Sequence, residues 1–140
     1  FADIAIRRKT GEQAILDMKW AGHARYPQKL RENRHLQLAL YAEIMRQSSG
    51  AWPSVAYFIL HRALLYATDD GFFPGAQVVT TSTSEGTADL WQRFLRTWRW
   101  RTGQVDRRAF EVVLESLDAA VTDAPTDDAL AIEYLNPNYN

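Results

Sequence analysis

Residues 54 to 61, SVAYFILH, form a compact apolar run that ends in a histidine. Valine, tyrosine, phenylalanine and isoleucine favour β-strands, and a continuous apolar run of this length is typical of a strand buried on both faces. Such a strand needs neighbouring strands for its backbone hydrogen bonds and other elements over its faces. The run therefore predicts a central strand, and the rest of the chain has to supply a sheet and covering helices.

The N-terminal part of the chain has the pattern of a β-hairpin. In residues 2–8 the isoleucines alternate with other residues, as expected of a strand. Thr10-Gly11 is suited to a hairpin tip, and residues 13–19 would form the second strand. The polar connection after this hairpin contains Pro27, which argues against a continuous helix there.

From about Leu30 to Gln47 the apolar residues have helical spacing. They form two adjoining stripes, with Leu36, Leu40 and Ile44 on one and Leu38, Ala42 and Met45 on the other. Gly50 and Pro53 are expected to end this helix. The helix would thus be a crossover between the hairpin and the central strand.

Further elements are predicted after the central strand. ALLYA at residues 63–67 favours another strand, and a second helix is expected from about Glu85 to Thr102. The expected inner side of that helix comprises Leu90, Phe94, Leu95 and Trp98. Residues 110–121 have helical spacing, although they could also start as a strand, and the tail after Pro125 is loop-like. The expected fold class is α/β (α+β), with a sheet flanked by helices.

The composition narrows the class of protein. A chain of 140 residues, 46% hydrophobic and 24% charged, is typical of a single globular domain. The net charge of −1 means that any nucleic-acid binding must come from a local basic patch. Because there is no cysteine, the chain cannot ligate an iron–sulfur cluster or a thiolate zinc site. No apolar run reaches the roughly 18 residues of a membrane span, and we expect a cytoplasmic protein.

The two ends of the chain suggest a piece of a longer protein. The sequence begins directly in an alternating apolar pattern, FADIAIRR, without an initiator methionine, and it stops in the polar stretch EYLNPNYN. We therefore expect residues 1–140 to be one domain of a longer chain.

Residues 14–20, AILDMKW, place two charges at the end of an apolar strand. Desolvating a charge costs several kcal/mol unless the charge is paired. Because side chains alternate along a strand, Asp17 and Lys19 share a face while Met18 points to the other. The two residues form either a structural ion pair or part of a catalytic cleft. An Asp-x-Lys triplet alone does not decide this, because chance gives one in about a third of chains of this length.

A second carboxylate, that of Asp3, lies on the first strand of the hairpin. If it converges on Asp17 within about 4 to 6 Å, the pair suits a hard cation such as Mg²⁺ or Mn²⁺, with the carbonyl of Met18 as a third oxygen. Such a cation activates a bound water and neutralises charge on a phosphate, and Lys19 would position the water or stabilise that charge. The plain alternative is that Asp3 is simply solvated.

The following helix offers Gln37 and Tyr41 one turn apart, so both face the same direction. A glutamine and a tyrosine next to a metal-bearing sheet suit contacts to a phosphodiester or a base. The alternative is a polar rim on an ordinary amphipathic helix.

Together these residues resemble the PD-(D/E)xK nuclease superfamily. The strand aspartate, ILDMKW and, about twenty residues later, QLALYA are most similar to the RecB-like exonuclease branch, in which a Gln-x-x-x-Tyr helix follows the Asp-x-Lys strand. The resemblance implies a restriction-endonuclease-like mixed central sheet flanked by helices. It also implies Asp3 and Asp17 as ligands of Mg²⁺ or Mn²⁺, Lys19 as the catalytic lysine, and Gln37 and Tyr41 near DNA.

The function implied by this resemblance is a metal-dependent deoxyribonuclease of exonuclease type, in DNA recombination, repair or phage DNA processing. Members of the branch have a preceding helix whose Glu or His completes the metal site, and this chain would begin after that helix. Exposed apolar surface is then expected on the N-terminal side of the sheet, covered by a second copy or a partner. The alternatives are an inactive nuclease-fold module that binds nucleic acid or a protein, and an unrelated domain in which Asp-x-Lys is accidental.

Other conspicuous residues have simpler interpretations. His61 closes the apolar run and is expected to be structural rather than a metal ligand. The second helix contains three tryptophans and four arginines: Trp91, Trp98, Trp100, Arg93, Arg96, Arg99 and Arg101. Their helical spacing favours a core face and a solvated basic face. The alternative is a surface that stacks on single-stranded bases. Residues 7–9, RRK, are expected at a solvated hairpin end, with phosphate contact as the alternative.

Overall fold

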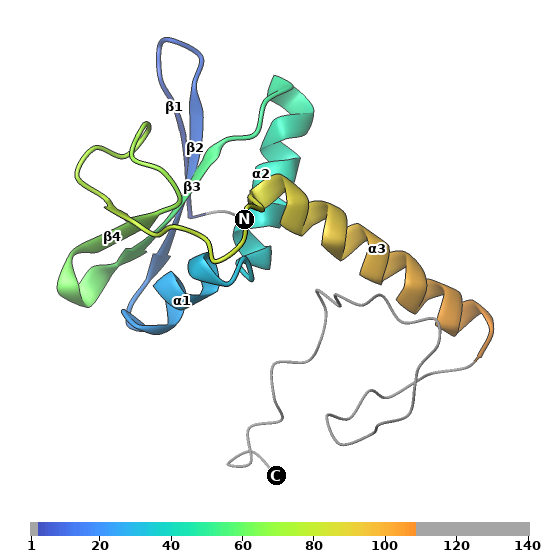
Figure 1. Cartoon of the computed structure of the whole chain (residues 1–140). Helices are drawn as coiled ribbons and strands as arrows, with labels where there is room; N and C mark the ends of the chain where they lie inside the picture. Colours follow the sequence, from blue (N-terminus) through green and yellow to red (C-terminus); the bar gives the residue numbers. More distant parts are fainter. Residues whose placement is uncertain (1–2, 109–140) are drawn as a thin grey trace. The chain divides into compact units, whose positions relative to one another are not determined.

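The computed structural model of the chain describes residues 3–108 (Figure 1). The chain divides into two compact units, of which the first ends at Trp91 and the second begins at Gln92. The first unit contains the sheet and every residue of the expected metal and DNA site. The segment 110–121 and the tail after Pro125 lie outside the described residues.

The first unit is built on an open mixed sheet of five strands, as the sequence predicts for the fold class. The strands are β1 (Ile4–Arg7), β2 (Gln13–Lys19), β3 (Ser54–Ile59), β4 (Leu64–Ala67) and β5 (Gln77–Val78). They lie in the order of the sequence, and β2 and β3 are parallel while β1–β2 and β3–β4 are antiparallel. The predicted central strand is in the middle of the sheet. The short β5 was not predicted from the sequence.

The described helices are α1 (Arg25–Arg31), α2 (Leu36–Ser49), the 3₁₀ turn η1 (Leu60–Arg62) and α3 (Thr87–Asp106). α2 lies in the crossover that joins the parallel strands β2 and β3, which such strands require. The prediction of one helix from Leu30 was wrong, because Asn33 adopts a left-handed conformation (φ 51°) between α1 and α2. Pro27 is inside α1 rather than breaking it, since in the first turn of a helix its missing N–H has no partner to lose.

The two faces of the sheet have different cores. One face packs against residues of α1 and α2, and its buried cluster comprises Ile15, Leu30, Leu38, Ala42, Val55, Tyr57, Ile59, Tyr66 and Val79. The other face packs against the loop after β4, and its smaller cluster comprises Ala14, Ala56, Ala67, Phe72 and Phe73. Because side chains alternate along β2, the face that carries Ile15 also carries Asp17 and Lys19. The charged pair therefore lies on the helix-covered face.

The orientation of α2 differs from the simplest sequence expectation. Its buried residues are Leu38, Ala39, Ala42 and Glu43. Leu40 and Ile44 are 41% and 59% exposed, so their stripe does not form the contact with the sheet. The adjoining stripe forms it instead, because two alanines let the helix backbone approach the sheet closely. Gln37 is consequently exposed and Tyr41 half-buried at the rim of that contact.

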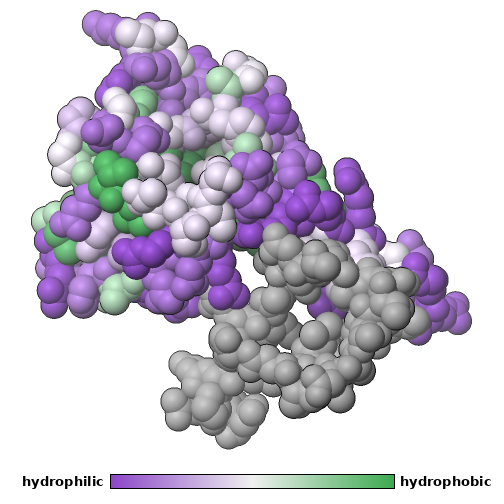
Figure 2. Space-filling model, in the orientation of Figure 1, coloured by the Kyte–Doolittle hydropathy of each residue, from purple (hydrophilic) through white to green (hydrophobic). Residues whose placement is uncertain are grey.

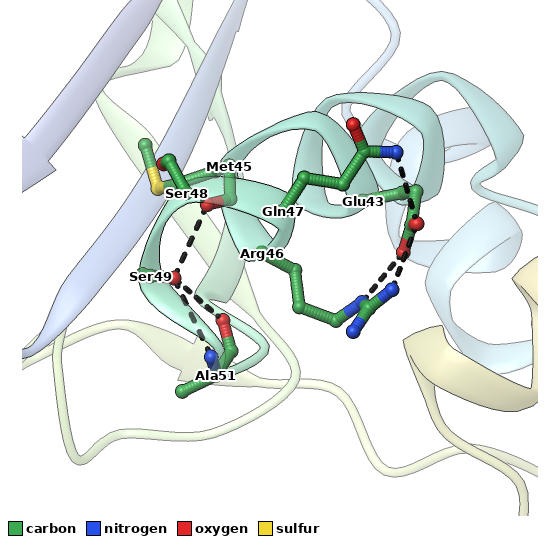
Figure 3. A network of polar contacts seen from close by, with 7 residues as sticks. All are labelled: Glu43, Met45, Arg46, Gln47, Ser48, Ser49 and Ala51. Carbon is green, nitrogen blue, oxygen red and sulfur yellow. Dashed lines mark hydrogen bonds and ion pairs between the residues drawn. The ribbon is translucent and has the colours of Figure 1, made fainter.

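Side-chain contacts hold the C-terminal part of α2 (Figure 3). The buried Glu43 accepts two hydrogen bonds from the Arg46 guanidinium, at 2.7 and 2.9 Å. The hydroxyl of Ser49 donates to the carbonyls of Met45 and Ala51, both at 3.1 Å. The helix ends before Gly50, whose left-handed φ of 78° lets its backbone N–H donate to the carbonyl of Arg46 at 2.7 Å.

The surface of the described residues is mostly hydrophilic on the face that Figure 2 shows, with apolar side chains in small groups. β1 is an outer strand of the sheet, and its Ile4 is 37% exposed. Coverage of that edge by a second copy or a partner stays a prediction. Within residues 3–108, no helix is both long and apolar enough to cross a membrane.

The second unit begins inside α3, so the predicted inner side of that helix is divided between the two units. Leu90, in the first unit, is buried as expected. Trp98, in the second, is 53% exposed, so its expected place on the inner side is wrong. The buried residues of α3 in the second unit are Thr97 and Gln104, which an apolar pattern does not identify.

Candidate functional site

Asp17 lies near the C-terminal end of β2 and is only 2% exposed. Its Cα is paired with that of Tyr57 on β3, and the two strands run parallel, so their C-terminal ends meet at one edge of the sheet. A buried carboxylate at that edge needs polar partners, because desolvation disfavours its charged form. Two residues supply them, Lys19 on the same strand and Asp3 across the hairpin.

Asp3 converges on Asp17, as the sequence predicts. It lies directly before β1 and not on the strand as predicted, and its Oδ2 accepts a hydrogen bond of 2.7 Å from the backbone N–H of Met18. This bond lowers the pKa of Asp3, and a hydrogen bond between its carboxyl group and that of Asp17 lowers it further. Burial raises the pKa of Asp17, and the neighbouring Asp3 adds to that increase although Lys19 opposes it. The two carboxyl groups thus share one site with unequal affinity for a proton.

Lys19 completes the charged centre. Its Nζ lies 2.8 Å from Oδ2 of Asp17, and its side chain is 20% exposed. Burial lowers the pKa of this lysine, but the hydrogen bond and the charge of Asp17 outweigh burial, so the pKa is raised overall. The ammonium group is therefore firmly protonated and held toward the edge of the sheet.

Gln37 and Tyr41 of α2 extend this centre. Oε1 of Gln37 accepts a hydrogen bond of 3.2 Å from Nζ of Lys19, and Nε2 of Gln37 donates to the hydroxyl of Tyr41 at 3.3 Å. The five residues chosen from the sequence thus form one continuous polar chain from Asp3 to Tyr41. In this chain the glutamine and tyrosine position Lys19; their expected contact with DNA stays a prediction.

Aromatic residues that the sequence analysis did not select line the centre. The ring centroid of Tyr26 lies 5.6 Å from Nζ of Lys19, and 4.8 Å from the ring centroid of Tyr57. Burial, with the nearby charge of Asp17, raises the pKa of Tyr57 well above its ordinary value. Gly22 makes room for this packing, because a Cβ at its position would lie 2.7 Å from the ring of Tyr26. Tyr26 is the second residue of the short helix α1, which has no apolar periodicity in the sequence, so no local pattern identifies it.

The carboxylate oxygens of Asp3 and Asp17 supply some of the ligands that a hard divalent cation needs. Two interacting carboxyl groups beside one ammonium leave an excess of negative charge, and carboxylate oxygens are the ligands that Mg²⁺ and Mn²⁺ prefer. Within residues 3–108, however, no group of three or more Asp, Glu, His or Cys side chains could hold a metal ion. Asp3 and Asp17 would therefore hold such a cation with the carbonyl of Met18 and water as the remaining ligands.

The other selected residues lie away from this centre. Of residues 7–9, Arg8 pairs with Glu12 and donates to the carbonyl of Phe72, at the hairpin end. His61 contacts the backbone of Trp20, in agreement with the structural role predicted for it. The tryptophans and arginines of α3 from Arg93 onward belong to the second unit.

Comparison with known proteins adds no relative. The chain matches no protein-family model, no curated protein and no solved structure.

Proposed function

We propose that this chain is a metal-dependent nuclease domain that hydrolyses phosphodiester bonds of DNA, with Asp3, Asp17 and Lys19 as its catalytic residues. The observation that carries the proposal is the continuous polar chain from Asp3 through Asp17, Lys19 and Gln37 to Tyr41. An ordinary structural ion pair explains Asp17 and Lys19, but it gives no reason for a second carboxylate and a helix-borne glutamine at the same place.

Each residue has a role that follows from its contacts. Asp3 and Asp17 are the oxygen ligands for Mg²⁺ or Mn²⁺, and the bound cation would supply an activated water and charge neutralisation. Lys19 is held protonated between Asp17 and Gln37, so its ammonium can donate to a phosphate oxygen as negative charge develops there. Gln37 and Tyr41 fix the position of that ammonium.

Net charge alone does not select a polyanionic substrate. The first unit, which holds the site, carries ten lysines and arginines and nine acidic residues within residues 3–91, and the whole chain has a net charge of −1. Attraction of nucleic acid to this unit therefore depends on local cations such as Lys19. The proposal includes a cytoplasmic setting and exonuclease-type action in DNA recombination, repair or phage DNA processing.

One observation favours a second candidate, an inactive nuclease-fold module that binds nucleic acid or a protein. The described residues offer two acidic ligands and no third, so they would leave a cation mostly hydrated. Such a site binds the metal weakly, and the same chain would then bind DNA without cleaving it.

A cleavage assay with variants tests the proposal. The 140-residue chain is incubated with linear and circular DNA in Mg²⁺, in Mn²⁺ and in EDTA, and metal binding is measured by calorimetry. Asp17→Asn should abolish metal binding and cleavage together, because it removes an anionic ligand. Lys19→Met keeps both acidic ligands, so at saturating metal the folded variant should still bind the cation, while cleavage per folded molecule falls about 10²-fold or more, as for other donors that act in the transition state.

Asp69→Asn is the matched control, since Asp69 is a half-buried carboxylate beyond β4 that contacts Ser54 and the backbone of Gly71. It should alter neither property. DNA binding without cleavage in either metal would favour the inactive module. Cleavage that Asp17→Asn and Lys19→Met leave unchanged would refute the assignment of the site.

A further inference from the structure

The residue after Lys19 is the most exposed of the large apolar side chains in residues 3–108: Trp20 is 75% exposed. β2 ends at Lys19, and the chain then bends toward Gly22, whose φ is +96°. Consecutive Cα atoms are about 3.8 Å apart, so the indole extends from a point directly beside the candidate catalytic lysine. An exposed tryptophan at this place contributes little to the core.

The backbone of Trp20 is nevertheless held firmly. Its carbonyl accepts hydrogen bonds from both the backbone N–H and Nδ1 of His61, at 3.3 and 2.8 Å. Because a carbonyl can only accept, Nδ1 carries the hydrogen, and Nε2 of the same ring accepts from Nε of Arg62 at 3.3 Å. The end of β2 is thereby tied to η1. The indole is exposed on a fixed main chain rather than on a loose loop.

The residues near the backbone of Trp20 expose little apolar area and include arginine and histidine side chains. Leu60 of η1 is 42% exposed, and Arg62 beside it is exposed as well. The ring of His23 lies 6.1 Å from that of His61, between ring centroids. Two exposed apolar side chains cannot supply the roughly 800 Å² per partner of a stable protein interface. An exposed aromatic ring on a main chain that is bonded to His61, the neighbour of Arg62 in the sequence, instead suits a nucleotide, with a flat base and a phosphate.

We propose that Trp20 is a stacking platform for an unpaired base of the strand whose phosphate lies at Lys19, and that Arg62 contacts a neighbouring phosphate. A base within a duplex is already stacked on both faces, whereas an unpaired base has a face free for the indole. The substrate class is therefore single-stranded DNA or a frayed end. This inference rests on the proposed function, since it takes the position of the scissile phosphate from it.

The test measures binding without cleavage. A fluorescently labelled oligothymidylate and a blunt duplex are titrated with the 140-residue chain in EDTA, and binding is followed by fluorescence anisotropy. Trp20→Ala should weaken binding to the single strand by about 5- to 160-fold, the range for one lost base-stacking contact. Trp20→Phe should retain most of the affinity, and binding to the blunt duplex should change little in both variants.

Two further variants complete the design. Arg62→Gln should reduce the slope of log Kd against log salt by about 0.7, as expected for one phosphate contact on a single strand. Trp98→Ala is the matched control, because Trp98 is also an exposed tryptophan but belongs to the second unit. It should leave the affinity unchanged. Thermal melting of every variant shows whether a loss of binding reflects unfolding.

The outcomes separate this inference from the proposed function. Selective loss of single-strand binding in Trp20→Ala supports the stacking site even when the wild-type chain cleaves no DNA. Unchanged single-strand binding in folded Trp20→Ala overturns it even when the wild-type chain is an active nuclease. Equal losses for single strand and duplex, a loss in Trp98→Ala instead, or no binding of oligothymidylate by the wild-type chain also overturn it.

Discussion

Lys19→Met should destabilise the protein much more than Asp17→Asn, and its cost should depend on pH. Without the lysine, the 2% exposed carboxyl of Asp17 must either stay charged and unpaired or take up a proton. With an ordinary pKa of 3.8, protonation costs about 4 kcal/mol at pH 7 and about 2 kcal/mol at pH 5. These values are upper limits on the penalty, because the carboxyl adopts whichever state is cheaper.

Asp17→Asn should change the stability much less, because it leaves no buried charge unpaired. Its partner Lys19 is 20% exposed and keeps Gln37 as an acceptor, so the ammonium is not stranded. The substitution also removes a carboxyl whose pKa burial raises. A group with a raised folded-state pKa stabilises the protein at low pH, and this contribution is lost as the pH rises through that pKa. We therefore expect Asp17→Asn to change the free energy of unfolding by less than about 1 kcal/mol at pH 7.

Urea denaturation at pH 5 and pH 7 measures both effects, and differences from the wild-type chain cancel the titration of all other groups. Lys9→Met is the control, since Lys9 is exposed at the hairpin end, and it should change stability by less than about 0.5 kcal/mol. The penalty of Lys19→Met should shrink by up to about 3 kcal/mol between pH 7 and pH 5. Equal penalties for the two site variants, independent of pH, would refute the reasoning.

Three other perturbations have definite expected results. Arg46 lowers the pKa of Glu43, so the stability that this carboxylate adds is present above its unfolded pKa and is lost as the pH falls through the folded pKa. Glu43→Gln should therefore lower the free energy of unfolding by about 1 to 3 kcal/mol at pH 7, and by less at pH 3, as measured by urea denaturation. Gly22→Ala should lower Tm, because φ is +96° and the new Cβ would meet the Tyr26 ring; an unchanged Tm would contradict this packing. Replacing the seven acidic residues of 109–140 by amides should tighten oligonucleotide binding at low salt, and an unchanged Kd would count against a dominant net-charge effect.

Local pattern was sufficient for much of the sheet. Alternation and the glycine at the hairpin tip predicted β2 at residues 13–19, where the structure has it, and the apolar run at residues 54–61 predicted the central strand, which ends at Ile59. Spacing also brought Asp17 and Lys19 to one face. These features depend on neighbours in the sequence, where the period of two decides which side chains share a face.

Tertiary structure decided the features that depend on packing between elements. Two stripes of α2 are both apolar, and only contact with the sheet selected the one with Leu38 and Ala42 over the one with Leu40 and Ile44. That choice sets the rotation of α2, which in turn brings Gln37 within hydrogen-bond distance of Lys19. The sequence by itself determined which residue types the site could use. Their assembly required the helix and the strand to pack in one register, because a hydrogen bond between elements depends on positions that no local period specifies.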